Sequence, residues 1–303
     1  MEKIIAVVVT YNRINCLKKL LKALKKQTVK LETIIVVNND STDGTREYLS
    51  MLDDIIVINQ ENIGGSGGFW SGLIEASRYA SDWIWCMDDD VYPRADCLEQ
   101  LLKFNSSDIG ILCPRRIQDG KVFYSEYKKL NLSNPFKPLH YLPLNDDDII
   151  ADAPVSIEGM VFEGPLIKRK IIDEIGFPNK ELFIFYDDTD YSYRTVLAGY
   201  KVLYVPSAIM DKEFFNKHLS REAIVNRQRW KTWYHIRNTA YFVNKYAKNS
   251  LFKNMGELQF PVHLFFAILF NLLRNKKYEF SDIKKLVLAY RYGKMGKLGK
   301  MPF

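Results

Sequence analysis

The chain has 303 residues, of which 47% are hydrophobic and 26% charged, so it can bury a sizeable core and has the composition of an ordinary globular protein. Its four cysteines show no Cys-x-x-Cys spacing and its four histidines are too few for a Cys/His zinc module, so we expect reduced, mostly buried thiols. The chain enters a predicted strand at once, without a basic and then apolar leader, and we therefore expect a cytoplasmic protein.

Positive charge gathers in the last third of the sequence. From Lys212 onward there are 19 basic and 5 acidic residues, although the net charge of the whole chain is only +7. A basic segment interleaved with apolar residues suits an anionic membrane surface, and we do not expect a nucleic-acid partner. The most apolar part, residues 260–273, is shorter than the roughly 20 residues that a membrane span requires. We expect it to lie on a membrane surface or in a core.

Buried strands and amphipathic helices alternate through the first part of the chain. Unbroken apolar runs predict strands at 4–10, 33–37, 55–59, 83–87 and 109–113. The helices expected between them are 14–24, 45–51, a segment ending near Tyr79, and 95–104. This order predicts an α/β fold with a mostly parallel sheet and helices on both faces.

The pattern changes after Pro114. Residues 114–154 are expected to form an inserted loop region over the active face, with room for a hairpin near 122–127. Regular structure is expected again at 158–162, in a helix at 168–175, in a strand at 182–186, in a helix ending near Gly199 and in a strand at 202–205. A long basic, aromatic helix at 221–247 and a basic amphipathic tail follow.

Three carboxylates, Asp88, Asp89 and Asp90, follow the predicted strand 83–87. Ligands of open α/β sheets bind outside the carboxyl ends of the strands, so these acids lie where chemistry is expected. Because neighbouring strand residues point to opposite faces, Asp88 and Asp90 can turn toward one site, which suits a hard divalent cation. For this segment taken alone, an acidic turn before the next helix is the alternative.

Three further loops follow strands at the same expected edge, at 10–13, 38–43 and 62–68. A nucleotide across that edge would meet these three loops and the acids at 88–90, and amides and carboxylates of the second loop can pair with a base and a ribose. The glycine-rich third loop predicts positive φ angles and backbone amides that face an anion. Its spacing fits neither a dinucleotide-binding fingerprint nor a phosphate loop.

A second acid cluster follows the predicted aromatic strand 182–186 and contains Asp187, Asp188 and Asp190. A carboxylate there suits a general base for an acceptor hydroxyl, a role worth ~10²–10⁴-fold in rate. Partial burial and neighbouring acids would raise the pKa of this carboxylate toward neutral pH, as suits a general base. The alternative is acids favoured by a helix dipole, but a gain of ~0.3–1 kcal/mol explains one acid and hardly three.

In this order and spacing, these motifs resemble the inverting family 2 glycosyltransferases with the GT-A fold, a Rossmann-like α/β fold, over roughly residues 3–238. The segments that carry the resemblance are 8–13, 36–45, 62–65, 88–90, 183–191 and 234–238. It implies a nucleotide-sugar-binding and catalytic domain at 1–210 and a helical, basic region at 211–303 for acceptor and membrane-surface contact. It also implies that the first three loops bind UDP and that Mn²⁺ or Mg²⁺ is held on its diphosphate.

The resemblance implies Asp188 as the catalytic base and Asp88 and Asp90 as metal ligands. His218 is the candidate for a third ligand, with Asp211 as the alternative, because the histidine that often completes the family's metal site is not at its usual place. Acceptor-side candidates are Asp187, Asp190, His235 and Arg237. Donor-binding candidates are Thr10, Tyr11, Asn12, Arg13, Asn38, Asp40, Asn62, Gly64, Gly65, Phe69, Trp70 and Asp89.

Two features bear on the donor and the acceptor. Asn38 stands where the family usually has an aspartate that contacts uracil, although an amide can still accept from the ring N–H. The glycine loop with Phe69 and a tryptophan looks most like bacterial galactofuranosyltransferases, with rhamnosyltransferases next. The long helix carries an aromatic stripe that consists of Trp230, Trp233, Tyr234 and Tyr241. We expect this stripe to pack the helix on the catalytic domain. Stacking of these rings on sugars of the acceptor is the alternative.

The resulting prediction is a metal-dependent, inverting transfer from a UDP-sugar, with UDP-galactofuranose as the best guess, to a hydroxyl of a lipid-linked or cell-surface polysaccharide. A rhamnosyltransferase using dTDP-rhamnose is the alternative, and a non-catalytic glycan-assembly scaffold is the alternative of another class. A nucleotidyltransferase would need a basic glycine-rich loop near the N-terminus, which residues 10–13 do not provide. We expect peripheral association with the inner face of the cell membrane.

Overall fold

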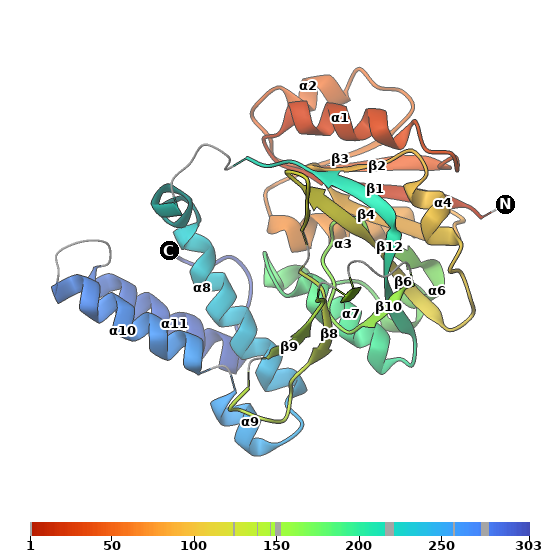
Figure 1. Ribbon diagram of the computed structural model, residues 1–303. Helices are drawn as coiled ribbons and strands as arrows, with labels where there is room; N and C mark the ends of the chain where they lie inside the picture. The colour runs from red at the N-terminus through yellow and green to blue at the C-terminus, as the bar shows by residue number, and fades with distance from the viewer. Residues whose placement is uncertain are drawn as a thin grey trace. The chain divides into compact units, whose positions relative to one another are not determined.

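The computed structural model shown in Figure 1 describes residues 2–123, 125–137, 139–145, 147–148, 153–215, 221–256, 258–273 and 279–303. The chain divides into two compact units. The first unit contains residues 1–129, 142–180 and 187–215, and the second contains residues 130–141, 181–186 and 216–303. The candidate metal and base carboxylates all belong to the first unit.

A large mixed sheet forms the centre of the first unit (Figure 1). Its strand order is β10 (Val155–Ile157), β12 (Lys201–Lys212), β6 (Ile109–Gln118), β11 (Leu166–Lys168), β4 (Trp83–Asp88), β1 (Ile4–Thr10), β2 (Thr33–Asn39) and β3 (Ile56–Gln60). The strands β4, β1, β2 and β3 form a parallel group. The predicted mostly parallel sheet is therefore confirmed, and its first strands begin and end close to the predicted positions.

The alternation of side chains along β1 explains why helices cover both faces. Ile4, Ala6 and Val8 belong to one buried cluster, whereas Ile5 and Val7 belong to the other. The first cluster takes in residues of α1 (Ile14–Leu24), α2 (Thr45–Leu49) and α4 (Cys97–Leu102). The second takes in residues of α3 (Gly64–Ala76), α6 (Arg169–Ile175) and α7 (Asp187–Leu197). A strand buried on both faces gives the unbroken apolar run seen in the sequence.

The far half of the sheet is more mixed than the sequence indicates. The strand β11 (Leu166–Lys168) is antiparallel to both of its neighbours, β4 and β6 (Ile109–Gln118). The predicted hairpin at 122–127 is wrong, because the turn is at Asp119 and Gly120, between β6 and β7. The remaining strands are β5 (Val91–Pro93), β7 (Lys121–Phe123), β8 (Tyr127–Leu130) and β9 (His140–Pro143). A separate two-stranded sheet contains β8 and β9.

Helices dominate the second unit. They are α8 (Arg221–Tyr246), α9 (Ser250–Met255), α10 (Gln259–Leu273) and α11 (Phe280–Met295). Gly293 allows α11 to approach α8 closely, because a Cβ there would lie 2.1 Å from the carbonyl oxygen of Arg237. Within the described residues, no helix combines the length and apolarity needed to cross a bilayer.

The predicted strand at 182–186 is wrong. A short 3-10 helix, η1 (Lys180–Leu182), is followed by an irregular segment in which Phe183, Phe185 and Tyr186 have φ between 66° and 69°. Asn238 of α8 stabilises this shape, because its Nδ2 donates to the carbonyl oxygens of residues 182, 184 and 185 at 2.8–2.9 Å. A repetitive strand could not present three carbonyl groups to one amide.

Candidate active site

The carboxyl ends of the parallel strands meet at one edge of the sheet. Thr10 at the end of β1 is in register with Asn38 of β2, and Val9 with Asp88 of β4. Asn38 is in turn in register with Asn59 of β3. The predicted convergence of four loops therefore follows directly from the strand pairing.

Asp89 is buried against Thr10, the last residue of β1, and Arg13 in the loop after it. Thr10 Oγ1 donates to Asp89 Oδ2 at 2.7 Å, and Arg13 Nη1 donates to Asp89 Oδ1 at 3.1 Å. Burial raises the pKa of Asp89 to about 6, although the charge of Arg13 and the Thr10 hydroxyl oppose this rise. Asp89 thus joins β4 to the first loop.

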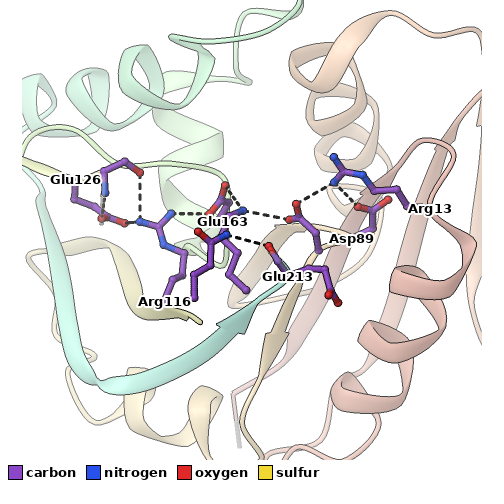
Figure 2. Close-up of polar contacts among 10 residues, drawn as sticks. Arg13, Asp89, Arg116, Glu126, Glu163 and Glu213 are labelled. Carbon is purple, nitrogen blue, oxygen red and sulfur yellow. Dashed lines mark hydrogen bonds and ion pairs between the residues drawn. The ribbon is translucent and has the colours of Figure 1, made fainter. Parts of the chain in front are cut away.

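Asp90 lies between two cations. Arg13 Nη1 is 3.0 Å from Asp90 Oδ2, and Lys212 Nζ is 3.4 Å from Asp90 Oδ1. Lys212 also contacts Glu163 Oε1 at 2.9 Å, and its side chain is only 10% exposed. Figure 2 labels Arg13 and Glu163, which lie at the two ends of this series of contacts.

The series of contacts continues behind Glu163 to a buried arginine (Figure 2). Arg116 donates from Nη1 to Glu163 at 3.0 Å and from Nη2 to Glu126 at 2.5 Å. Burial favours the neutral form of Glu163, but Arg116 and Lys212 outweigh it and lower the pKa of this carboxyl. Positive and negative charges therefore alternate from Glu126 to Asp89.

Asp88 differs from its two neighbours. Its side chain is partly exposed, and within the described residues no side-chain hydrogen bond or ion pair reaches its carboxylate. Burial, together with the charges of Asp90, Glu163 and Asp89, raises its pKa well above the usual range. Crowded carboxylate oxygens with excess negative charge have the chemistry that a hard divalent cation prefers. The described residues contain no cluster of three or more metal-binding side chains, and His218 lies outside them.

The first two loops are bonded to each other. Asn12 accepts from the backbone N–H of Thr42 at 2.7 Å, and Ser41 accepts from the N–H of Asn12 at 2.9 Å. Asn12 and Asp40 have φ of 53° and 63°, so two sharp turns lie side by side. Asp40 is exposed, as is Tyr11. These contacts order a polar rim along the sheet edge.

Asn38 is fully buried beneath this rim. Its Nδ2 donates to Asn59 Oδ1 at 2.8 Å, and its Oδ1 accepts from the N–H of Ser41 at 3.1 Å. The amide therefore bonds protein groups on both sides. A carboxylate at this position could not donate to Asn59, which gives a structural reason for an amide here.

The glycine-rich segment is helix, not loop. Helix α3 begins at Gly64, which alone among the glycines at 64, 65, 67 and 68 has a positive φ, of 82°. Asn62 Oδ1 accepts from the N–H of Gly64 at 3.0 Å. A Cβ at Gly68 would lie 2.5 Å from Val9 Cγ1, and one at Gly72 would lie 2.3 Å from Val7 Cγ1. These two glycines therefore let α3 pack directly on β1.

The two predicted aromatic donor contacts have different surroundings. Phe69 is 3% exposed and stacks on Phe162 with ring centroids 4.4 Å apart, so its ring belongs to the core. Trp70 is partly exposed, and Lys180 Nζ lies 4.2 Å from its ring centroid. Among these residues, Trp70 presents the more accessible ring.

The second acid cluster opens α7. Burial raises the pKa of Asp187 to about 6. Burial and then the charge of Asp187 raise the pKa of Asp188 well above its usual range, and Glu163 adds to this rise. Asp188 is partly exposed, and its Oδ1 accepts from the N–H of Thr189 at 2.6 Å. Asp190 is buried and forms an ion pair with Arg194 at 2.9 Å.

Two predicted acceptor-side residues belong to the second unit. Arg237 is buried and donates to the carbonyl oxygens of Leu182 and Gly299, which gives it a structural role. The ring of His235 lies 6.0 Å from Phe185 and 5.8 Å from Tyr186, measured between centroids. In the aromatic stripe, Trp233 and Tyr234 are in the unit's core whereas Trp230 is 44% exposed.

Some residues at the site are missing from the predictions. Glu163 influences the pKa of both Asp88 and Asp188, so it lies within electrostatic reach of both acid clusters. Lys212 and Arg116 pair with it. The predicted alternative ligand Asp211 is half exposed and pairs with Arg94 at 3.1 Å.

Known proteins related to this chain by sequence are glycosyltransferases. Residues 5–176 match the family model "Glycosyl transferase family 2". The galactofuranosyltransferase GlfT1 of Mycolicibacterium smegmatis is 28% identical over 214 residues, which are 65% of this chain and 67% of that protein. The O-antigen chain rhamnosyltransferase RfbN of Salmonella typhimurium is 24% identical over 213 residues, covering 69% of this chain and 65% of that protein.

A solved structure supports the fold. The crystal structure of GalNAc-T7 with UDP, GalNAc and Mn²⁺ superposes with a TM-score of 0.56 at 15% identity. It covers 84% of this chain and 54% of that one, so the match spans about half of the larger protein. The family model spans more than half of the present chain, and the named relatives are glycosyltransferases. The chain is a glycosyltransferase and belongs to glycosyl transferase family 2.

Proposed function

We propose that this glycosyltransferase moves a sugar from a UDP-sugar to a hydroxyl of a lipid-linked or cell-surface polysaccharide and inverts the anomeric configuration. The favoured donor is UDP-galactofuranose. The observation that carries the proposal is the position of two acid clusters in one compact unit: Asp88 and Asp90 at the end of β4, and Asp187, Asp188 and Asp190 in the first turn of α7. One cluster can serve the leaving group and the other the acceptor, which are the two ends of the same displacement. The relatedness to GlfT1 of M. smegmatis supports galactofuranose as the sugar.

Asp188 is proposed as the base. Its raised pKa favours proton uptake from an acceptor hydroxyl, and the carboxylate is partly exposed. The acceptor oxygen then attacks the anomeric carbon opposite the departing UDP, and a single in-line displacement inverts the anomeric configuration. Asp187 and Asp190, in the same first turn of α7, are the proposed acceptor-side residues beside it.

The donor would lie along the polar rim. Arg13 is fixed by two carboxylates and offers positive charge at the sheet edge, where a diphosphate would need it. The proposed donor-binding residues remain those of the first two loops, Asn62, the start of α3 and the turn after β4: Thr10, Tyr11, Asn12, Arg13, Asn38, Asp40, Asn62, Gly64, Gly65, Phe69, Trp70 and Asp89. Of these, Tyr11, Asp40 and Trp70 have exposed or partly exposed side chains, while Asn38 and Phe69 are buried.

Asp88 and Asp90 are proposed to hold Mn²⁺ or Mg²⁺, with His218 as a third ligand. When bound, such an ion takes up negative charge on a departing diphosphate. The GalNAc-T7 structure, which contains Mn²⁺, supports this proposal. Asp90→Ala should lose Mn²⁺-dependent UDP binding in calorimetry, and unchanged binding would remove Asp90 as a ligand.

A donor panel tests the proposed reaction. Hydrolysis and transfer should be measured with UDP-galactofuranose, UDP-galactose, UDP-glucose and dTDP-rhamnose. UDP-galactofuranose is expected to give the highest rate, and the Asp188→Asn enzyme should be slower by ~10²–10⁴-fold or more. The relative RfbN favours rhamnose as a second candidate, which would appear as turnover of dTDP-rhamnose alone.

Helix α10 is proposed to touch an anionic membrane surface. Several of its large apolar side chains are at least 36% exposed, namely Val262, Phe265, Phe266, Leu269 and Phe270. The sequence from residue 212 onward is strongly basic, which adds attraction to anionic lipid. Replacing Phe266 and Phe270 with serine should reduce cosedimentation with anionic vesicles, and equal binding would contradict this role.

A further inference from the structure

Lys212 places a fixed positive charge inside the acid cluster. Its Nζ lies 3.4 Å from Asp90 Oδ1 and 2.9 Å from Glu163 Oε1. At the end of β12, Lys212 pairs with Val91 on one side and Gln118 on the other, so its backbone is held in the sheet. With 10% of the side chain exposed, the ammonium group has little room to move into solvent.

Glu163 keeps Lys212 in this position. Glu163 is itself held by Arg116, whose side chain is completely buried and pairs with Glu126 as well. The series of contacts from Glu126 to Lys212 is therefore anchored from behind by a buried ion pair. If one of these ion pairs broke, a buried charge would be left unpaired, which is energetically costly. This cost keeps the Lys212 ammonium group beside Glu163.

Cations occupy both oxygens of Asp90, while Asp88 lacks such partners among the described residues. Arg13 approaches Asp90 Oδ2 at 3.0 Å from one side, and Lys212 approaches Oδ1 from the other. A divalent ion held by Asp88 and Asp90 would bring further positive charge to a carboxylate that the Lys212 ammonium already contacts at 3.4 Å. Like charges this close to one carboxylate repel each other strongly where water is scarce.

We propose that Lys212 is a built-in competitor of the divalent cation and that it sets the metal affinity of the Asp88–Asp90 site. The inference rests on the proposed metal-dependent function. Lys212 neutralises Asp90 and Glu163 when no metal is bound, and the metal ion has to displace this contact. Lys212 is a positioning residue here, because it acts on the carboxylates and not on the reacting sugar.

Mn²⁺ binding to the full chain without nucleotide tests the proposal, using calorimetry and the EPR signal of free Mn²⁺. Lys212→Met removes the charge at similar length and should bind Mn²⁺ about tenfold more tightly or better. Lys212→Arg keeps the charge and should stay within about threefold of the wild type. Lys19→Met is the matched control, because Lys19 pairs with Glu213 at 3.0 Å on the exposed surface and should leave Mn²⁺ affinity unchanged.

The gained affinity must come from the same carboxylates. Adding Asp88→Asn to Lys212→Met should abolish the gain. Equal or weaker Mn²⁺ binding by the Lys212→Met variant would overturn the proposal, as would a gain that survives Asp88→Asn. If the methionine variant fails to fold, as judged by circular dichroism, Lys212→Gln takes its place with the same expectation.

These outcomes are separate from turnover. A chain that shows the gain in Mn²⁺ affinity but transfers no sugar from any UDP donor would contradict the proposed donor while leaving the Lys212 inference standing. A chain that transfers sugar but shows no change in Mn²⁺ affinity on Lys212→Met would do the reverse.

Discussion

Thr10 and Asp89, 79 positions apart in the sequence, are joined by a 2.7 Å hydrogen bond from Oγ1 to Oδ2 inside the protein. The bond links the end of β1 to the turn after β4, two strands that pair in parallel. The Thr10 hydroxyl also opposes the effect of burial on Asp89, because a hydrogen bond to the ionised carboxylate lowers its pKa. The bond therefore ties the first acid cluster to the carboxyl edge of the sheet.

Thr10→Val tests this link, because valine has nearly the same shape and no hydroxyl. The variant should lose about 1–3 kcal/mol of stability, since a buried carboxylate loses a donor. Urea unfolding monitored by circular dichroism measures the loss. Thr42→Val is a control of the same kind at an exposed position of the rim and should change the free energy of unfolding by less than about 0.5 kcal/mol.

The close packing of α3 on β1 gives a second prediction. Gly72→Ala would place a Cβ 2.3 Å from Val7 Cγ1 and should destabilise the protein by about 1–3 kcal/mol. Gly65→Ala meets no atom within 4 Å and, in a helix, should stabilise it by up to about 1 kcal/mol. Thermal unfolding of the two variants distinguishes the sites, and a Val7→Ala change should recover part of the loss at Gly72.

The same helix shows what the sequence could and could not predict. Runs such as 4–10 identify strands buried on both faces, since few other structures need so many consecutive β-branched residues. A cluster of glycines, however, permits both a phosphate-binding loop and a tightly packed helix. Which of the two forms depends on the distance between α3 and β1, which is a tertiary property. The short strands β5, β7 and β11 have only three residues each and carry no readable period.

A similar limit applies to the site. Asp88 and Asp188 are recognisable because acids follow apolar segments at both places. Glu163 and Lys212 were not predicted, because their role depends on where β11 and β12 lie in the sheet order. That order places Lys212 beside acids more than 40 positions away along the chain. A single acid before a three-residue strand, or a lysine at the end of a long strand, gives no local signal of such a contact.

Asn238 gives a third prediction, for the segment before the second acid cluster. Asn238→Leu removes the donor to three carbonyl oxygens and should cost about 2–5 kcal/mol in the unfolding of the second unit. Asn244→Leu is the matched control on the same helix, because its Nδ2 reaches one carbonyl oxygen, that of Lys294, at 3.2 Å. The control should lose about 1 kcal/mol. Equal losses in urea unfolding would contradict a special role for Asn238.

Asp188→Asn gives a fourth prediction. The amide keeps the shape and the contact with Thr189 but accepts no proton, so turnover should fall by ~10²–10⁴-fold or more. UDP binding, measured by calorimetry, should stay within about threefold of the wild type, since the donor is proposed to bind at the other acid cluster. Wild-type turnover by this variant would remove Asp188 as the base. Asp173→Asn, at a solvent-exposed ion pair with Arg169, controls for a general effect of losing one carboxylate.

The pH dependence of turnover gives the last prediction. Only the ionised form of Asp188 can accept a proton, so the rate should fall as the pH drops through its pKa. Because burial and then Asp187 raise that pKa, this acidic limb should lie well above the value of about 4 that is usual for an aspartate. Asp187→Asn removes a neighbouring negative charge and should move the limb to lower pH, whereas Asp173→Asn should leave it in place. A limb that stays fixed, or moves to higher pH, in the Asp187→Asn enzyme would show that another group controls the reaction.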